Sequence, residues 1–203
     1  MTVIVTDPKT LFIHVPKAGG TSIQQWLFNN CNGKSAKGTY GKHCPHSLIK
    51  EEKDWFSFGV VRNPWDRLVS AYFYEMKVAK FRLKCIEENR PEVKPQKQGW
   101  TKKFNMGTLS RLEKGFGHFV VSKRYGPCEH TQCFFLNGVD RVLRLENIEN
   151  DFKKIQQRFN CFVPLAVENT TEHKNYRKYY TKKTEKIVRE YFAEDIEKFS
   201  YEF

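Results

Sequence analysis

A junction near the N-terminus, "FIHVPKAGGTSI" at residues 12–23, limits what this chain can fold into more than any other feature. An apolar run ends in Pro-Lys-Ala-Gly-Gly-Thr-Ser, and apolar residues then return at helical spacing. Gly19 and Gly20 allow a tight turn and bring backbone N–H groups close to a ligand. Thr21 and Ser22 would begin the helix, where free N–H groups and the helix dipole favour an anion. The junction predicts a strand, a phosphate-binding loop and a helix, although an ordinary capped turn explains the same residues.

A second anion site is indicated by "VVRNPWDRLVSAY" at residues 60–72. Arg62 ends an apolar strand there, and Ser70 lies in the helix that follows. An arginine fork matches phosphate oxygens, and a serine hydroxyl adds a hydrogen bond. The alternative is that Arg62 pairs with a structural carboxylate such as Asp66. Lys17 of the first motif precedes its glycines, whereas the lysine of nucleotide hydrolase loops follows them.

Strands and helices alternate along the chain, which predicts an α/β fold with a central parallel sheet flanked by helices. We expect strands at 11–15, 56–62 and 141–146, and helices at 21–30, 65–80, 110–126, 147–159 and 181–199. Both anion motifs would then follow strands at the carboxyl edge of the sheet, where ligands bind in such folds. A length of 203 residues suits one domain, 1–203, with 81–110 as a variable basic excursion.

Positive charge is concentrated in two segments. The net charge is +12; residues 80–103 hold eight Lys/Arg and three Asp/Glu, a net of +5, and residues 170–190 hold seven and three, a net of +4. Solvated faces explain such runs one at a time. Two of them in a chain with anion-binding loops favour an acidic substrate or a phosphorylated cofactor. No nucleic-acid-binding motif is present, so nucleic acid is not the expected partner.

Membrane, metal and disulfide signals are weak. No apolar run approaches the ~20 residues of a membrane span, and the N-terminus lacks signal-peptide features. The six cysteines have no framework spacing, and most of them are expected to be reduced and structural. Neither "HCPH" (43–46) nor "CEHTQC" (128–133) has a zinc spacing, so no metal is expected. The lack of a membrane span and of a signal peptide favours a cytoplasmic protein.

The two anion motifs together resemble those of sulfotransferases. "FIHVPKAGGTSI" is similar to their 5′-phosphosulfate loop and "VVRNPWDRLVSAYFY" to their 3′-phosphate motif. The carbohydrate branch, with heparan sulfate 2-O-sulfotransferases and chondroitin sulfotransferases, is the most similar. The resemblance extends to residues 141–152 and 169–201 and leaves 81–110 unmatched. It implies a P-loop-like nucleotide-binding fold and transfer of a sulfuryl group from 3′-phosphoadenosine 5′-phosphosulfate (PAPS) to a hydroxyl. The product would be 3′-phosphoadenosine 5′-phosphate (PAP). Animal members of the family are anchored in the Golgi, so the resemblance implies a microbial or viral protein rather than a trimmed Golgi domain.

The resemblance also implies roles for individual residues. Lys17 would stabilise charge on the bridging oxygen of the phosphosulfate, and Arg62 and Ser70 would bind the 3′-phosphate. The phosphosulfate would be cradled by the loop residues Ala18, Gly19, Gly20, Thr21 and Ser22. A closing segment over the nucleotide would comprise Thr170, Thr171, Lys174 and Tyr176.

A histidine is the expected general base, because its pKa lies near neutrality and the acceptor hydroxyl must lose a proton. The family branch carries one shortly before the second phosphate strand, and "GKHCPHSLI" offers His43 and His46 there. Matching the spacing to the family pattern favours His43, with His46 as the runner-up. His14, inside an apolar strand, is interpreted as a core residue.

The acceptor is expected to be a carbohydrate, and an anionic one would suit the basic excursion. Its candidate contacts there are Lys94, Lys97, Trp100, Lys102 and Lys103, since a sugar ring stacks on an aromatic side chain. Three alternatives stay open: a small-molecule kinase with a degenerate phosphate loop, a basic nucleic-acid-binding module, and a sulfotransferase fold that only binds nucleotide. The position of Lys17 argues against the kinase.

Overall fold

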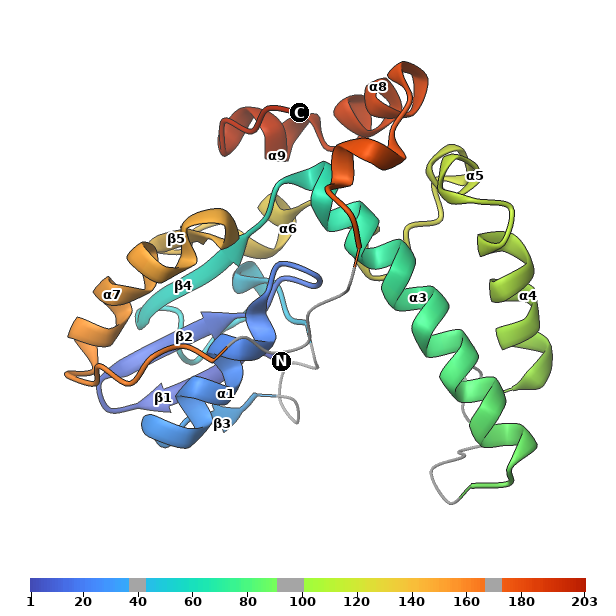
Figure 1. Cartoon of the computed structure of the whole chain (residues 1–203). Coiled ribbons are helices and arrows are strands. Elements are labelled where there is room, and N and C mark those ends of the chain that lie inside the picture. Colours follow the sequence, from blue (N-terminus) through green and yellow to red (C-terminus); the bar gives the residue numbers. More distant parts are fainter. Residues whose placement is uncertain (37–42, 91–100, 167–172) are drawn as a thin grey trace. The chain divides into compact units, whose positions relative to one another are not determined.

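The computed structural model describes residues 1–36, 43–90, 101–166 and 173–203 (Figure 1). The chain forms two compact units, and each is discontinuous in sequence. The first unit comprises Met1–Pro64, His130–Thr170 and Glu194–Glu202. The second comprises Trp65–Glu129, Thr171–Ala193 and Phe203.

A five-stranded sheet forms the centre of the first unit, in the order β3-β1-β2-β4-β5. The strands are β1 (Val3–Thr6), β2 (Lys9–Ile13), β3 (Lys34–Ser35), β4 (Phe56–Val61) and β5 (Arg141–Arg144). β2, β4 and β5 are mutually parallel, whereas β1 is antiparallel to both β2 and β3. The predicted α/β fold and its three parallel strands are confirmed, and two short antiparallel strands extend the sheet at one side.

Helices cover both faces of this sheet, as parallel strands require. On one face lie α1 (Gly20–Asn30) and α7 (Ile148–Arg158), which Figure 1 shows against the strands. Trp26 of α1 meets Phe152 of α7 edge-on at 5.0 Å between ring centroids. Both belong to a buried cluster that includes Phe12, Phe58 and Leu143 from the three parallel strands.

The other face is approached by the short helix α6 (Gln132–Leu136). A side chain at Gly59 of β4 would place its Cβ 2.2 Å from a Leu136 methyl group, so the glycine allows this close packing. The first unit also contains the 3₁₀ turns η1 (His46–Leu48) and η4 (Leu145–Asn147) and all but the first residue of the helix α9 (Ala193–Lys198).

The second unit is helical. It holds nearly all of α3 (Pro64–Glu87), together with α4 (Lys102–Leu112), α5 (Phe116–Ser122), η3 (Gly126–Cys128), η5 (Tyr176–Tyr179) and α8 (Lys182–Tyr191). Its core is aromatic: Tyr72 packs against Phe116 and Phe119 at 5.5 Å, and Tyr125 packs against Tyr191 at 4.8 Å. The Tyr72 hydroxyl donates to the carbonyl of Leu112, which ties α3 to the end of α4.

Several predicted elements differ from the observed ones; the strand expected at 11–15, for example, is β2 at Lys9–Ile13. The helix expected at 65–80 continues to Glu87, because Leu83 and Ile86 follow Ala79 at helical spacings and extend its apolar side. The excursion expected at 81–110 is therefore helical at both ends, while Lys94, Lys97 and Trp100 lie outside the described residues.

The helices expected at 110–126 and 181–199 are each interrupted. Gly115 breaks the first with a φ of 93°, a conformation that leaves the α-helical region. The second ends as α8 at Tyr191 and restarts as α9 at Ala193, so its apolar residues are shared between two units.

Candidate active site

The connection from β2 to α1 holds its backbone in unusual conformations. β2 ends at Ile13 and α1 begins at Gly20. Between them, Lys17 has a φ of 64° and Gly19 a φ of 78°, both in the left-handed region. Glycine adopts this region freely, but a lysine there carries a steric cost, and such strain clusters at functional sites. Lys17 is half-buried in this loop.

Both glycines of the loop are in close contact with neighbouring side chains. A Cβ on Gly19 would lie 2.4 Å from a methyl group of Leu145, which belongs to η4. A Cβ on Gly20 would lie 2.8 Å from the ring of His14. The loop backbone is thus packed between η4 and His14, and side chains at these positions would force it outward.

The first turn of α1 is suited to an anion. Within the described residues no side chain caps this helix, and its first turn contains no acidic residue. Its first N–H groups have no partner inside the helix, and the helix dipole places partial positive charge beside them. Thr21 and Ser22 lie in this turn and are partly exposed, so their hydroxyls add donors to the same region.

Arg62 lies beside this loop. It follows β4 directly, and β4 pairs in parallel with β2, so the carboxyl ends of the two strands lie at the same edge. The Arg62 guanidinium donates through Nη1 to the backbone carbonyl of Lys17 at 3.4 Å. The two anion motifs, 45 residues apart in sequence, therefore meet within the first unit.

Other side chains fix the turn after β4. The Gln132 side chain accepts from the Arg62 N–H and donates to the Arg62 carbonyl, both at 2.9 Å, so it pairs with that backbone as a strand would. A Glu146 oxygen accepts from the Asn63 N–H at 2.6 Å, and its other oxygen accepts from the Tyr201 hydroxyl at 3.1 Å. Burial, followed by the Glu146 carboxylate, raises the pKa of Tyr201. None of these supporting residues was singled out from the sequence.

His43 contacts the loop through His14. Its Nδ1 lies 3.0 Å from the His14 carbonyl oxygen, and the two rings meet edge-on at 5.0 Å. A carbonyl only accepts, so Nδ1 carries the proton in this hydrogen bond and Nε2 is left as the basic nitrogen. His14 is buried as expected, but it also contacts both His43 and the start of α1, a role that the sequence interpretation missed.

His46, the other candidate base, has different neighbours. Its Nδ1 lies 3.2 Å from the carbonyl oxygen of Asn137, and its ring would contact a Cβ on Gly138. Asn137 and Gly138 belong to the segment between α6 and β5, and this segment leads into the amino end of β5. Of the two histidines, His43 is the one that the structure places beside the phosphate loop.

The remaining predicted site residues belong to the second unit or lie outside the description. Ser70 is buried on α3, Lys174 is exposed, and Tyr176 begins η5 with its ring 5.7 Å from Phe203. Thr170 and Thr171 lie outside the described residues.

A comparison with models of protein families identifies the family of the chain. A model of the sulfotransferase family matches residues 1–202. This chain belongs to the sulfotransferase family. Searches among curated proteins and among solved structures find no match.

Sulfotransferases of this family generally use PAPS as donor. The hydrogen-bond donors of this loop suit the phosphosulfate end of PAPS, because among the described residues the first turn of α1 has no side-chain cap and no acidic residue, and Thr21 and Ser22 lie there partly exposed. Lys17 and Arg62 supply positive charge at the same edge of the sheet. The described part of the sulfotransferase contains no group of three His, Cys, Asp or Glu residues arranged to hold a metal.

Two further properties of the sulfotransferase bear on the sequence predictions. Among its described helices, none has the length and apolar character needed to cross a membrane. All six cysteines are free thiols in the structure, and five of them are buried. Burial raises the pKa of the Cys133 thiol to about 12, with the Asp195 carboxylate as a second cause, so this cysteine is a packing residue rather than a nucleophile.

Proposed function

We propose that this sulfotransferase transfers a sulfuryl group from PAPS to a hydroxyl of a carbohydrate, with His43 as general base. The observation that carries the proposal is the meeting of Lys17 and Arg62 at the carboxyl edge of the sheet, through a hydrogen bond of 3.4 Å. Two cationic residues that follow neighbouring strands suit a donor with two separated phosphates. The carbohydrate acceptor and the donor's identity as PAPS rest on the resemblance of the motifs.

PAPS, when bound, would supply a sulfuryl group activated by its anhydride bond to the 5′-phosphate. The α1 amides and the Thr21 and Ser22 hydroxyls would hold that end, and the Arg62 fork would hold the 3′-phosphate. Ser70, Thr170, Thr171, Lys174 and Tyr176 remain predicted nucleotide contacts.

The remaining chemistry is proton transfer and charge stabilisation. In the proposed reaction the acceptor oxygen bonds to sulfur while the bond from sulfur to the bridging phosphate oxygen breaks. Nε2 of His43 takes the hydroxyl proton, and the Lys17 ammonium stabilises the charge that develops on the departing oxygen. Lys17 and the loop amides would supply the positive charge that Mg²⁺ supplies in kinases, so we expect no metal requirement.

The first experiment is calorimetric titration of PAP into the wild type and Arg62→Ala without magnesium. We expect metal-independent binding that weakens about 10- to 100-fold in the variant, the loss of one or two charge-assisted hydrogen bonds. Arg141→Ala is the matched control, because Arg141 is also half-buried at a strand end but begins β5. Its affinity for PAP should match that of the wild type.

The opposite outcome is equally informative. Magnesium-dependent binding of ATP without any binding of PAP would support the kinase alternative and overturn the proposal. Equal losses in Arg62→Ala and Arg141→Ala would remove the assignment of Arg62 as a phosphate ligand.

A further inference from the structure

Two cysteines of the first unit lie just past the ends of neighbouring helices. Cys31 follows α1 directly, and its N–H donates to the Leu27 carbonyl at 3.1 Å. Cys161 comes shortly after α7, and its N–H donates to the Gln156 carbonyl at 3.0 Å. Because α1 follows β2 and α7 follows β5 on the same face of the sheet (Figure 1), both helices end at the amino edge of these parallel strands.

The chain around Cys161 packs on the C-terminal half of α1. The Trp26 indole N–H donates to the Val163 carbonyl at 2.7 Å, and the Trp26 ring meets that of Phe159 at 6.0 Å. These contacts lie on both sides of Cys161 in the sequence. Cys31 belongs to the buried cluster around Trp26, and Cys161 packs against the same cluster. The packing of α1 against the chain after α7 therefore brings the two cysteines together.

The two thiols also interact electrostatically. Burial raises the pKa of the Cys31 thiol to about 11, and the charge of Cys161 is the second cause. Among the described residues, the pKa values of two other thiols are raised, by burial at Cys44 and by burial and then the Asp195 carboxylate at Cys133. Of these three cysteines, Cys31 is thus the one whose ionisation is affected by a second cysteine.

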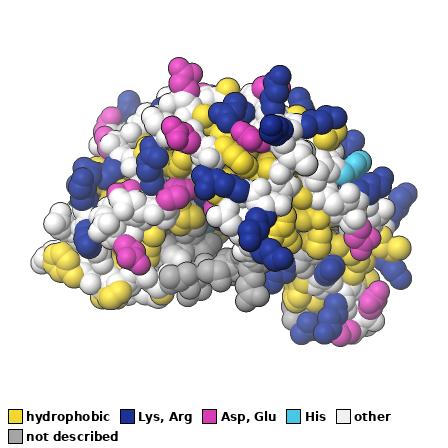
Figure 2. All heavy atoms as spheres, turned by 45° about the horizontal axis from the view of Figure 1, so that its top comes forward, with side chains coloured by type: hydrophobic (Ala, Val, Ile, Leu, Met, Phe, Trp, Pro, Cys, Tyr) yellow, Lys and Arg dark blue, Asp and Glu magenta, His cyan; other side chains and the backbone are white. Residues whose placement is uncertain are grey.

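The two cysteines differ in exposure. Cys31 is buried, whereas Cys161 is partly exposed. A dissolved oxidant therefore meets Cys161 first, and Cys31 reacts only with a sulfur that is already held beside it. Oxidised glutathione, a small anionic disulfide, is attracted to a chain with a net charge of +12, and Figure 2 shows Lys and Arg side chains spread over one face of it.

We propose that Cys31 and Cys161 form a reversible disulfide in the presence of a low-molecular-mass disulfide such as oxidised glutathione. The bond needs Cα atoms about 4.4–6.8 Å apart. Both cysteines lie in the connections after their helices, so either one can shift toward the other without removing a turn of helix. The pair lies at the amino edge of the sheet and the phosphate loop at the carboxyl edge, so the inference does not rest on the proposed sulfuryl transfer.

The bond would form by two thiol–disulfide exchanges. The Cys161 thiolate attacks one sulfur of oxidised glutathione, the S–S bond breaks, and one glutathione leaves as a thiolate. Cys31 then loses its proton to water, and its thiolate attacks the Cys161 sulfur of the mixed disulfide. The second glutathione leaves as a thiolate. Two electrons thus pass from the protein thiols to one glutathione disulfide, and the two protons go to the solvent.

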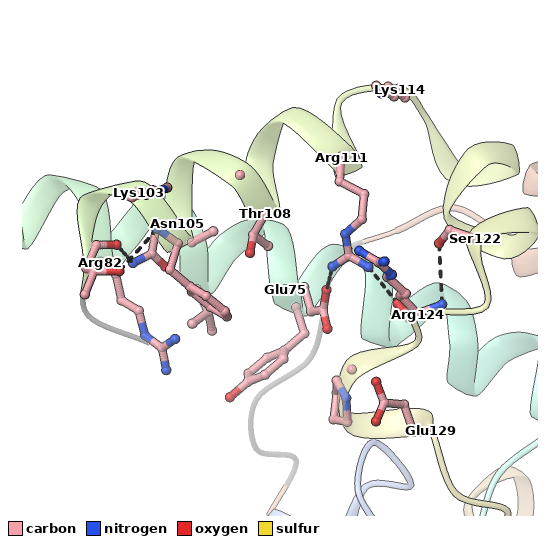
Figure 3. A pocket seen from close by; sticks show the side chains of 18 of the residues that line it. Glu75, Arg82, Lys103, Asn105, Thr108, Arg111, Lys114, Ser122, Arg124 and Glu129 are labelled. Carbon is pink, nitrogen blue, oxygen red and sulfur yellow. Dashed lines mark hydrogen bonds and ion pairs between the residues drawn. The ribbon is translucent and has the colours of Figure 1, made fainter. Parts of the chain in front are cut away.

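This bond would cross the discontinuity of the first unit. It would join Met1–Pro64 to His130–Thr170 and enclose the whole insertion Trp65–Glu129 in a covalent loop. The insertion has internal support: Figure 3 shows Arg111 reaching from α4 to pair with Glu75 of α3 at 2.9 Å, along an open groove of about 1340 Å³. In the unfolded chain the bond removes the conformational freedom of this long segment, which stabilises the oxidised protein.

The test equilibrates the full chain with glutathione mixtures that range from fully reduced to fully oxidised. Peptide mapping by mass spectrometry without reduction identifies the linked cysteines. We expect the loss of two free thiols per chain, a link between the Cys31 and Cys161 peptides, and complete reversal by dithiothreitol. The melting temperature of the oxidised protein should lie about 5–15 °C above that of the reduced protein.

Single variants separate the two exchanges. Cys31→Ala should stop at a glutathione adduct on Cys161, because the second thiol is missing. Cys161→Ala should keep Cys31 as a free thiol, because the buried sulfur does not meet the oxidant. Cys44→Ala is the matched control: it removes another buried cysteine of the first unit and should form the same link as the wild type.

Four results would overturn the proposal. They are retention of both thiols in fully oxidised glutathione, a link that joins other cysteines, a link between two chains seen as a dimer on a non-reducing gel, and a link that forms only after unfolding in urea. A linked protein whose melting temperature is unchanged or lower would contradict the expected stabilisation.

Discussion

At the scale of single residues, two glycines with opposite surroundings test the loop. Gly19 has a positive φ and faces a Leu145 methyl group, so Gly19→Ala should lower the free energy of unfolding by about 1–2 kcal/mol and weaken PAP binding. Gly107, inside α4, has open space where a Cβ would lie. Gly107→Ala should raise the free energy of unfolding by about 0.5–1 kcal/mol. Urea unfolding measures both, and stabilisation by Gly19→Ala would contradict the loop geometry.

The two candidate bases, His43 and His46, give a second pair of variants to compare. His43→Ala should lower kcat by about 10²–10⁴, the usual contribution of a general base, without changing PAP affinity. His46→Ala should leave kcat close to that of the wild type, because its contacts are with the segment before β5. Single-turnover kinetics with a sulfated product as readout tests this, and a larger loss in His46→Ala would reverse the assignment.

How much of the site could be predicted depends on how far apart the interacting residues lie in the sequence. Lys17, Gly19 and Gly20 form a local motif, and their loop lies as predicted between a strand and a helix. Gln132 and Glu146 could not be found this way, because they act on Arg62 and Asn63 from 70 and 83 residues away. An isolated glutamine or glutamate carries no signal of such a partner.

At the scale of elements, α6 depends on a buried carboxylate from α9. The two Asp195 oxygens accept from the N–H groups of Gln132 and Cys133, each at 2.8 Å, at the start of α6. Asp195→Ala should lower the free energy of unfolding by about 2–4 kcal/mol, since two buried N–H groups lose their acceptors. Asp195→Asn, with one oxygen left, should cost about half as much. Because Gln132 holds Arg62, both variants should also weaken PAP binding.

The control for this element is Asp54→Ala, an exposed aspartate in the same unit whose removal should change unfolding by less than about 0.5 kcal/mol. Urea denaturation gives the free energies and calorimetry the PAP affinities. Undiminished PAP binding in a destabilised Asp195→Ala would show that α6 does not position Arg62.

Element boundaries were predicted less well than element types. The apolar side of α3 continues past residue 80, but the charged residues in that segment made its helical spacing hard to recognise in the sequence. The strong amphipathic pattern at 181–199 does not report the break at Phe192, because the apolar side chains on both sides of it are buried, each in its own unit. A helical spacing of apolar residues identifies a helix in the sequence. It does not show which unit the apolar side packs against, because tertiary structure decides that.

At the scale of the whole molecule, buried tyrosines predict a loss of stability at alkaline pH. Burial raises the pKa of Tyr72, Tyr180, Tyr191 and Tyr201, and raises that of Tyr125 to about 12. Below pH 10 the folded and unfolded states both keep these protons, so stability is unaffected. Above pH 10 the unfolded state loses them first, and the free energy of unfolding falls by about 1.4 kcal/mol per pH unit for each tyrosine concerned.

Urea unfolding between pH 9 and pH 12 measures this slope. Tyr125→Phe should reduce it, although that variant also loses the hydrogen bond from the hydroxyl to the Val120 carbonyl. A slope that is the same in the wild type and in Tyr125→Phe would show that Tyr125 ionises equally in both states.

The sheet shows how far the fold could be read from the sequence. β2 and β4 are mostly apolar runs buried on both faces, which is the strongest strand signal in the chain, whereas β5 begins and ends with arginine and only its Leu143 is buried. β1 and β3 have four and two residues, too short for alternation to be read with certainty. A single domain spanning 1–203 remains a prediction, and the two units are described separately.

The discontinuity of the first unit has a consequence for how the protein is made. The phosphate loop and Arg62 leave the ribosome well before Asp195 and Tyr201, which hold α6 and Glu146. Domains fold as units once their parts are available. The donor site should therefore stay unformed during translation until the segment from Asp195 to Tyr201 has emerged.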